Sequence, residues 1–277
     1  MEYLETNQIF LTPNIGANPR RTFSLEDSLK SMDKNQKVFI VGICGGQGGG
    51  KTKLAKYLSK NIDKSAIIEE RSFFKAAKAK RKITCGDGLL MGKFGEFSEE
   101  RKLLLVELSN KNSYDYKKLY SNLLSLINGK PVTIKQFDEI EGRYTGDEIE
   151  INPKFISLII LEGYFIFKDD KVRNLINLKI FNEIDDDVRL SRLLVNENRF
   201  LKNVPIAFKH FFMIYEKYIK LAYEKDIYPT KKQAKIILSN VLVKDEEKKE
   251  EVIYEDETLS LLINNLQNVA NRQKFNF

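Results

Sequence analysis

Short apolar runs along the chain alternate with segments in which apolar residues recur every three or four positions. The two strongest runs span residues 38–43 and 156–161. Such nearly uninterrupted runs are typical of strands that are buried on both faces. Shorter runs predict further extended segments at 66–69, 132–134, 178–181 and 234–238.

Segments with helical spacing separate these runs. The spacing predicts helices at 52–61, 114–127, 187–198, 206–223 and 259–269. The second of these helices stops at Asn128-Gly129, a sequence that commonly ends a helix. Because strands and helices alternate, we expect an α/β fold with a mostly parallel central sheet.

The two ends of the chain differ from this regular middle. Residues 1–36 are polar and irregular, so we expect an N-terminal arm, either a loosely ordered extension or a docking element. Residues 244–251 carry charges of both signs, as a solvated loop or helix face does. The expected division is therefore an arm (1–36), one domain (37–243), and a charged loop with a C-terminal helix (244–277).

Composition narrows the class of protein. The 277 residues are 42% hydrophobic, and no stretch is apolar enough to predict a transmembrane helix. The early acidic residues Glu2 and Glu5 do not fit a secretory signal or a transit peptide. The two cysteines, Cys44 and Cys85, are too few for a disulfide framework, and with the single His210 they cannot form a standard zinc site. We therefore expect a cytoplasmic protein, in a reducing intracellular compartment, with no membrane partner.

The net charge of +7 permits binding to RNA or to an anionic surface, but a nucleotide-binding enzyme tolerates the same charge. The chain shows no helicase-like motif. We therefore do not expect a nucleic-acid partner.

Candidate chemistry appears directly after the first predicted strand, in the pattern Gly-x-x-x-x-Gly-Lys-Thr. Its residues are Gly45, Gly46, Gln47, Gly48, Gly49, Gly50, Lys51 and Thr52. Glycines let backbone N–H groups turn around phosphate oxygens without a Cβ clash, and the following helix adds its positive N-terminal end. Lys51 can reach the β- and γ-phosphates, and the Thr52 hydroxyl can ligate Mg²⁺. The pattern predicts an ATP or GTP site; a glycine-rich turn that binds no nucleotide is the alternative.

A carboxylate ends the second strong apolar run, at Glu162-Gly163. The carboxyl ends of parallel strands meet at the edge of the sheet where ligands bind, beside the glycine loop. Glu162 can therefore hold Mg²⁺ through water. The alternative is a strand-ending glutamate that meets only solvent.

Seven further segments follow or flank the loop in a distinctive order. They are 70–75 (Glu-Arg-Ser-Phe-Phe-Lys), 114–116 (Tyr-Asp-Tyr), 128–132 (Asn-Gly-Lys-Pro-Val), 136–138 (Gln-Phe-Asp), 161–163 (Leu-Glu-Gly), 186–192 (Asp-Asp-Val-Arg-Leu-Ser-Arg) and 228–234 (Tyr-Pro-Thr-Lys-Lys-Gln-Ala). Together with the loop, they resemble the uridine kinase family of the phosphoribulokinase/uridine kinase group. The resemblance covers about residues 37–242 and implies a three-layer P-loop NTPase fold with a helical lid.

The resemblance also implies an activity. The family uses ATP and Mg²⁺ to phosphorylate the 5′-hydroxyl of uridine or cytidine, and relatives act on pantothenate, ribulose 5-phosphate or nicotinamide riboside. Lys51 would then act on the phosphates, with Thr52 and Glu162 at the metal. Arg189 and Arg192 fall on the lid helix, where arginines can neutralise charge on the transferred phosphoryl group. For Arg189, a salt bridge on a helix face is the alternative.

Departures from the family pattern concentrate on the acceptor side. The family aspartate that accepts the hydroxyl proton falls on Arg71, which cannot act as a base. The family's Phe-Asp-His-Pro substrate motif falls near residues 108–111, which keep none of it. The histidine that reads the pyrimidine falls near Gly142.

Two functions follow from this mixture of matches and departures. The first is a uridine kinase-like, ATP-dependent phosphotransferase that acts on a nucleoside or similar small alcohol. The second is a catalytically silent relative that serves as a structural or regulatory subunit, in a homo-oligomer or a larger assembly, through its arm and tail. A basic cluster at residues 75–82 fits either a phosphate-facing lid or a solvated face.

Overall fold

The computed structural model describes residues 36–75, 99–201, 205–239 and 257–272. Almost all of the expected arm, most of the basic cluster, Cys85 and the charged run at 244–251 lie outside these ranges. Within them, no helix has the length and apolar character needed to cross a membrane.

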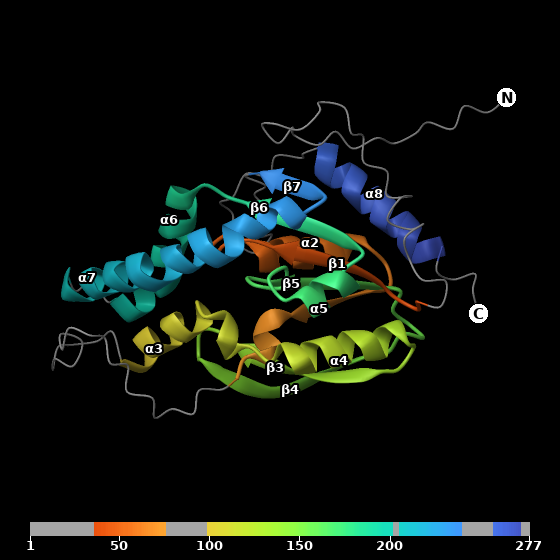
Figure 1. Cartoon of the computed structure of the whole chain (residues 1–277), viewed down its shortest axis with the longest axis horizontal. Helices are drawn as coiled ribbons and strands as arrows, with labels where there is room; N and C mark the ends of the chain where they lie inside the picture. Colours follow the sequence, from red (N-terminus) through yellow and green to blue (C-terminus); the bar gives the residue numbers. More distant parts are fainter. Residues whose placement is uncertain (1–35, 76–98, 202–204, 240–256, 273–277) are drawn as a thin grey trace.

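A five-stranded sheet forms the centre of the molecule (Figure 1). Its strands, in spatial order, are β2 (Ser65–Glu69), β5 (Leu158–Gly163), β1 (Phe39–Cys44), β6 (Leu178–Glu183) and β7 (Ile236–Ser239). All four pairings are parallel. The predicted α/β class and the mostly parallel sheet are therefore confirmed.

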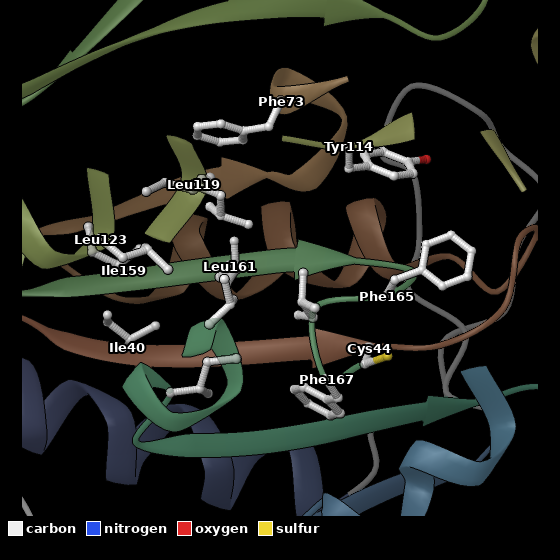
Figure 2. Close-up of a cluster of buried hydrophobic side chains, with 14 of the residues drawn as sticks. Ile40, Cys44, Phe73, Tyr114, Leu119, Leu123, Ile159, Leu161, Phe165 and Phe167 are labelled. Carbon is white, nitrogen blue, oxygen red and sulfur yellow. The ribbon is translucent and has the colours of Figure 1, made fainter. Parts of the chain in front are cut away.

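Alternate residues of the strands pack against different layers of helices. Val41 and Ile43 of β1 contact the cluster that includes α2 (Lys51–Asn61) and α8 (Glu257–Arg272). Ile40 and Cys44 belong to the opposite cluster, beneath α4 (Tyr116–Ile127) and α5 (Asp170–Leu175). Figure 2 shows this second layer, where Leu119 and Leu123 of α4 lie over the sheet. The sheet is thus covered on both faces, which explains its nearly continuous apolar strands.

A hairpin of two antiparallel strands, β3 (Val132–Asp138) and β4 (Arg143–Ile151), lies outside the main sheet. It packs near α4 on the lower side of Figure 1. The extended segment predicted at 132–134 belongs to β3, whereas β4 was not predicted. Most side chains of β4 are exposed, so this strand lacks the apolar pattern of the buried ones.

A third hydrophobic cluster joins three helices at one end of the sheet. These helices are α3 (Glu99–Leu108), α6 (Asp186–Leu201) and α7 (Pro205–Ile214), and α7 continues through π-helical turns at Tyr215–Lys220 and Tyr223–Ile227. Buried Phe211, beside His210 in sequence, is central to the cluster. The short helical turns Glu70–Phe73, Lys111–Ser113 and Tyr228–Gln233 complete the connections. Helices at 187–198 and 206–223 were predicted, but α3 was not.

The packing of α8 on the sheet gives a stability prediction. Leu266 is fully buried against the sheet, so Leu266→Ala should lower the free energy of unfolding by about 2–5 kcal/mol. The control Asn268→Ala changes an exposed residue of the same helix and should cost less than about 0.5 kcal/mol. Urea denaturation of the full chain measures both. Equal stability of the two variants would show that α8 does not cover the sheet.

Candidate active site

The glycine loop connects β1 to α2 at the carboxyl edge of the sheet. Gly48 and Gly50 have φ values of 72° and 79°, in the left-handed region that favours glycine. A Cβ on Gly48 would also collide with the backbone carbonyl of Arg189. The loop therefore needs glycine at these positions to keep its shape.

A hydroxyl and a carboxylate meet beside this loop. Because β5 pairs in parallel with β1, Glu162 lies level with Ile43, just before the loop begins. The Thr52 Oγ1 atom donates a hydrogen bond of 2.9 Å to Oε1 of Glu162. Burial raises the pKa of Glu162, while the charges of Arg71 and Lys51 oppose that rise. A hydroxyl and a carboxylate are hard oxygen donors, so this pair fits the ligand preference of Mg²⁺.

Lys51 lies inside the loop. Its Nζ atom donates a 2.9 Å hydrogen bond to the carbonyl of Gly46 and lies 3.9 Å from the ring centroid of Tyr164. Burial lowers the pKa of Lys51, and the carboxylate of Glu162 opposes this shift. The ammonium group is thus held where the loop glycines converge.

The two predicted lid arginines pack against the loop from α6. Arg189 is 1% exposed, stacks 3.6 Å from the ring centroid of Tyr223 and pairs with Asp186 at 2.5 Å. The salt bridge given above as the alternative for Arg189 therefore exists, and the arginine side chain is buried. Its Nε and Nη1 atoms have no hydrogen-bond partner among the described residues, and Nη1 would collide with a Cβ on Gly46. Buried donors without partners, of which Nη1 lies against Gly46 of the loop, fit an anionic ligand there.

Arg192 lies at the edge of the same loop. Its Nη1 atom is 3.4 Å from the Gly48 carbonyl oxygen. The structure therefore places Glu162, Arg189 and Arg192 beside the eight loop residues. The side chain of Arg199, a further arginine on α6, lies outside what the structure describes.

Two polar residues outside the loop, Asn182 and Ser109, support it and were missed by the sequence analysis. Asn182, near the end of β6, donates from Nδ2 to the Gly49 carbonyl at 2.6 Å. Gln47 donates from Nε2 to Ser109 Oγ at 3.3 Å. The only signal in the sequence was a polar residue, Asn182, at the end of an otherwise apolar strand.

Arg71, where the resemblance predicts the acceptor, is surrounded by carboxylates. It makes a two-pronged ion pair with Glu69, at 2.8 and 2.6 Å, and a 3.0 Å bond to Glu139. Its Nη2 atom lies 4.0 Å from Oε1 of Glu162. Burial lowers the pKa of Arg71, but the hydrogen bonds to Glu69 and the charges of Glu162 and Glu139 together raise it above its ordinary value, so the guanidinium remains charged. Arg71 therefore neutralises carboxylates where a base would be expected.

Glu70 points away from Arg71, into the end of β5. Its carboxylate accepts hydrogen bonds from the backbone N–H groups of Tyr164 and Phe165 and from the Tyr116 hydroxyl, at 2.6 to 3.2 Å. The side chain is 1% exposed, and this burial raises the pKa of Glu70 to about 7. Glu70 fixes the backbone directly after Glu162.

Little space remains between these groups. The cavity lined by Glu70, Arg71, Glu139, Glu162, Gly163 and Tyr164 has a volume of about 10 Å³. That volume holds about one water molecule. We name it the acceptor cavity, because it adjoins both Glu162 and Arg71.

Aromatic rings of the hairpin pack against Phe74, three residues after Arg71. The Phe137 ring packs against Phe74 at 5.1 Å and against Tyr144 at 5.2 Å between centroids. Gly142 has a φ of 66°, in the left-handed region, so a histidine at this position would be strained, and its Cβ would lie 2.8 Å from a methyl of Leu104.

Arg101 of α3 ties three elements together. It forms a buried ion pair with Glu197 of α6 and donates to the carbonyls of Glu139 and Ile140, at 2.8 and 3.0 Å, in the hairpin turn. Nothing in the local sequence pattern indicated this contact. It links the lid helix to the turn that carries the Glu139 partner of Arg71.

A phosphate loop after the first strand, a threonine–glutamate pair and arginines on a covering helix define a nucleotide-binding protein of the P-loop kinase class. The sequence profile of the "Phosphoribulokinase / Uridine kinase family" matches residues 40–246. The chain therefore belongs to this family, as the sequence resemblance predicted.

Several relatives are similar over most of the chain. A uridine kinase from Lactobacillus helveticus is 27% identical over 210 residues, covering 75% of this chain and 89% of that protein. Uridine kinase-like protein 3 from Arabidopsis thaliana is 26% identical over 219 residues, covering 76% of this chain and 41% of that protein. Among solved structures, a putative fructose transport system kinase from Silicibacter sp. TM1040 superposes with a TM-score of 0.52 at 16% identity, over 77% of this chain and 96% of that one. The last similarity bears on the fold alone.

The buried carboxyl of Glu70 predicts a pH effect on stability. Its pKa is about 7 in the folded chain and 4.5 as the ordinary value, so the folded state binds more protons between these pH values. The stabilising contribution of the neutral form is present below about pH 4.5 and is lost as the pH rises through 7. Glu70→Gln should reduce the loss of unfolding free energy over this pH range by up to about 3 kcal/mol.

Urea denaturation of the wild type and Glu70→Gln from pH 4.5 to 8 measures the difference. Glu69→Gln serves as the control, because Glu69 is next to Glu70 in the sequence but its carboxylate is ion-paired with Arg71. Parallel stability curves for the wild type and Glu70→Gln would contradict the assignment.

Proposed function

We propose that the chain is an ATP-dependent phosphotransferase of the uridine kinase type, which transfers a phosphoryl group to a nucleoside or a similar small alcohol. The observation that carries the proposal is the 2.9 Å contact between Thr52 and Glu162, next to the glycine loop. Family membership supports phosphotransfer as the reaction class. GTP is the alternative donor, because the loop recognises phosphates rather than the base.

In this proposal, the loop N–H groups hold the nucleotide phosphates, and the Lys51 ammonium exchanges the Gly46 carbonyl for a phosphate oxygen. Thr52 and Glu162 hold Mg²⁺, which when bound neutralises phosphate charge. Arg189 offers its two unpartnered donors, Nε and Nη1, to the same anion. Arg192 contributes charge from the same helix, so positive groups surround the transferred phosphoryl group.

The space available to an acceptor alcohol limits the proposed activity. An alcohol larger than water needs the Arg71–Glu139 pair to separate, because the acceptor cavity has only about 10 Å³. The loss of a general base typically costs about a hundred- to ten-thousand-fold in rate, so slow transfer is compatible with Arg71. The closed cavity is also the observation that favours the second candidate, a catalytically silent subunit.

We further propose the division into an arm (1–36), a kinase domain (37–243) and a tail (244–277), with any assembly contacts made by the arm and tail. A reducing, intracellular compartment is proposed from the cysteine content: only two cysteines, of which Cys44 is free and buried.

The Thr52 hydroxyl provides the most direct test of the metal role. Thr52→Val removes the hydroxyl but keeps the shape of the side chain. It should reduce by about 10-fold or more the factor by which Mg²⁺ strengthens ATP binding. Thr52→Ser keeps the oxygen and should stay close to wild type. Calorimetric titration of ATP, with and without Mg²⁺, measures both. If Thr52→Val and Thr52→Ser show the same effect of Mg²⁺ on ATP affinity, Thr52 is not a metal ligand.

Turnover separates the two candidate functions. ATP consumption is measured with a panel of nucleosides and small alcohols, beside Lys51→Ala, which should lower any true activity by about 100-fold or more. Acceptor-dependent ADP formation that disappears in Lys51→Ala supports the kinase. Tight ATP binding without turnover on any acceptor would reject it in favour of the silent subunit.

A further inference from the structure

A larger cavity lies beside the N-terminal end of α4, and we name it the lysine cleft. Its volume is about 560 Å³, within the range of about 300–1,000 Å³ that small-molecule sites occupy. Four lysines and two aspartates line it: Lys75, Lys111, Lys117, Lys168, Asp115 and Asp169. Lys51, Thr52 and Glu162 are not among its lining residues, so the cleft is separate from the nucleotide loop.

Both aspartates of the cleft are engaged as helix caps. Asp115 accepts a 3.0 Å hydrogen bond from the backbone N–H of Lys118, at the start of α4. Asp169 accepts one of 2.9 Å from the backbone N–H of Val172, at the start of α5. Each carboxylate thus has a structural role as a helix cap. Four lysines against two aspartates leave the lining with a formal surplus of two positive charges.

The four lysines are not equally occupied. Lys168 pairs with Asp226 at 2.9 Å, and Lys75 donates to the carbonyl of Asn112 at 3.0 Å. Across the described ranges, the ammonium groups of Lys111 and Lys117 have neither a hydrogen bond nor an ion pair. Two cations therefore face the cleft with their donors available.

The tyrosines in the lining contribute surface rather than free donors. The Tyr114 hydroxyl donates to the carbonyl of Leu108 at 2.9 Å, and the Tyr116 hydroxyl donates to Glu70 at 2.6 Å. Tyr116 thus connects the cleft to Glu70, which lines the acceptor cavity. The polar recognition available to a ligand in the cleft comes mainly from the lysines.

We propose that the lysine cleft binds a small anionic metabolite carrying a phosphate monoester, at a site independent of the glycine loop. Lysine is a compact point charge that binds phosphate well, and two free ammonium groups match the double charge of a phosphate monoester. The volume leaves room for the organic part of the ligand. A neutral sugar gains none of these charge-assisted bonds.

The test is a calorimetric titration of the full chain with ribose 5-phosphate, beside inorganic phosphate and ribose. A saturating, non-hydrolysable ATP analogue occupies the glycine loop during the titration. We expect one saturable site for ribose 5-phosphate and none for ribose. Inorganic phosphate as strong as the ester would support the site and identify the anion alone as the ligand.

Two neighbouring lysines provide matched variants. Lys117→Glu should weaken ribose 5-phosphate binding by at least about tenfold, because a charge-assisted hydrogen bond is replaced by repulsion. Lys118→Glu changes the next residue, which is exposed but outside the lining, and should weaken it less than about threefold. If both variants lose affinity for ribose 5-phosphate equally, diffuse surface charge explains the binding, and the proposal is overturned.

Absence of saturable binding would also overturn the proposal. The same titration in Lys51→Ala, without the ATP analogue, keeps the result independent of the proposed kinase function. Binding that persists there and is lost in Lys51→Ala combined with Lys117→Glu locates the anion in the cleft. Binding that is lost in Lys51→Ala alone assigns the anion to the glycine loop and rejects the cleft.

Discussion

The parallel pairing of β1 with β5 is the constraint on which the site depends. It places Ile43 level with Glu162, so the loop that leaves one strand and the carboxylate that ends the other meet at one edge of the sheet. Thr52, in the first turn of α2, then reaches that carboxylate directly. Parallel strands need long crossover connections, and the chain between β1 and β5 supplies α3, α4 and the hairpin. The glycine loop and α2 therefore lie in the same connection between β1 and β5 as α3, α4 and the hairpin.

Much of the fold could be predicted because its signals are local. Strands buried on both faces read as continuous apolar runs, and the glycine loop is a short pattern with a fixed consequence. Three elements were missed, β4, α3 and the six-residue helix α5, and the first two lack such signals. β4 exposes most of its side chains, and α3 has no clear apolar stripe, since it contacts both the hairpin and the lid helices. Their structure is decided by tertiary contacts rather than by periodicity.

The candidate site divides in the same way. Lys51, Thr52 and Glu162 were predicted together, because strand order brings the ends of parallel strands to one place. The carboxylates that surround Arg71 could not be predicted, since they come from positions 69, 139 and 162 and meet only in the folded chain. The sequence showed that the expected base was replaced. Only the structure shows that the replacement is neutralised and that the neighbouring space is closed.

The buried pair of Arg101 and Glu197 has a mechanical consequence. Separating a buried ion pair leaves a desolvated charge and costs about 3–5 kcal/mol. A state with this pair broken would therefore be populated in roughly one molecule in a hundred to one in several thousand. Since Arg101 also donates to two carbonyls of the hairpin turn, one buried side chain on α3 connects α6 to that turn. Moving α6 away from α3 and the turn therefore requires this buried pair to break.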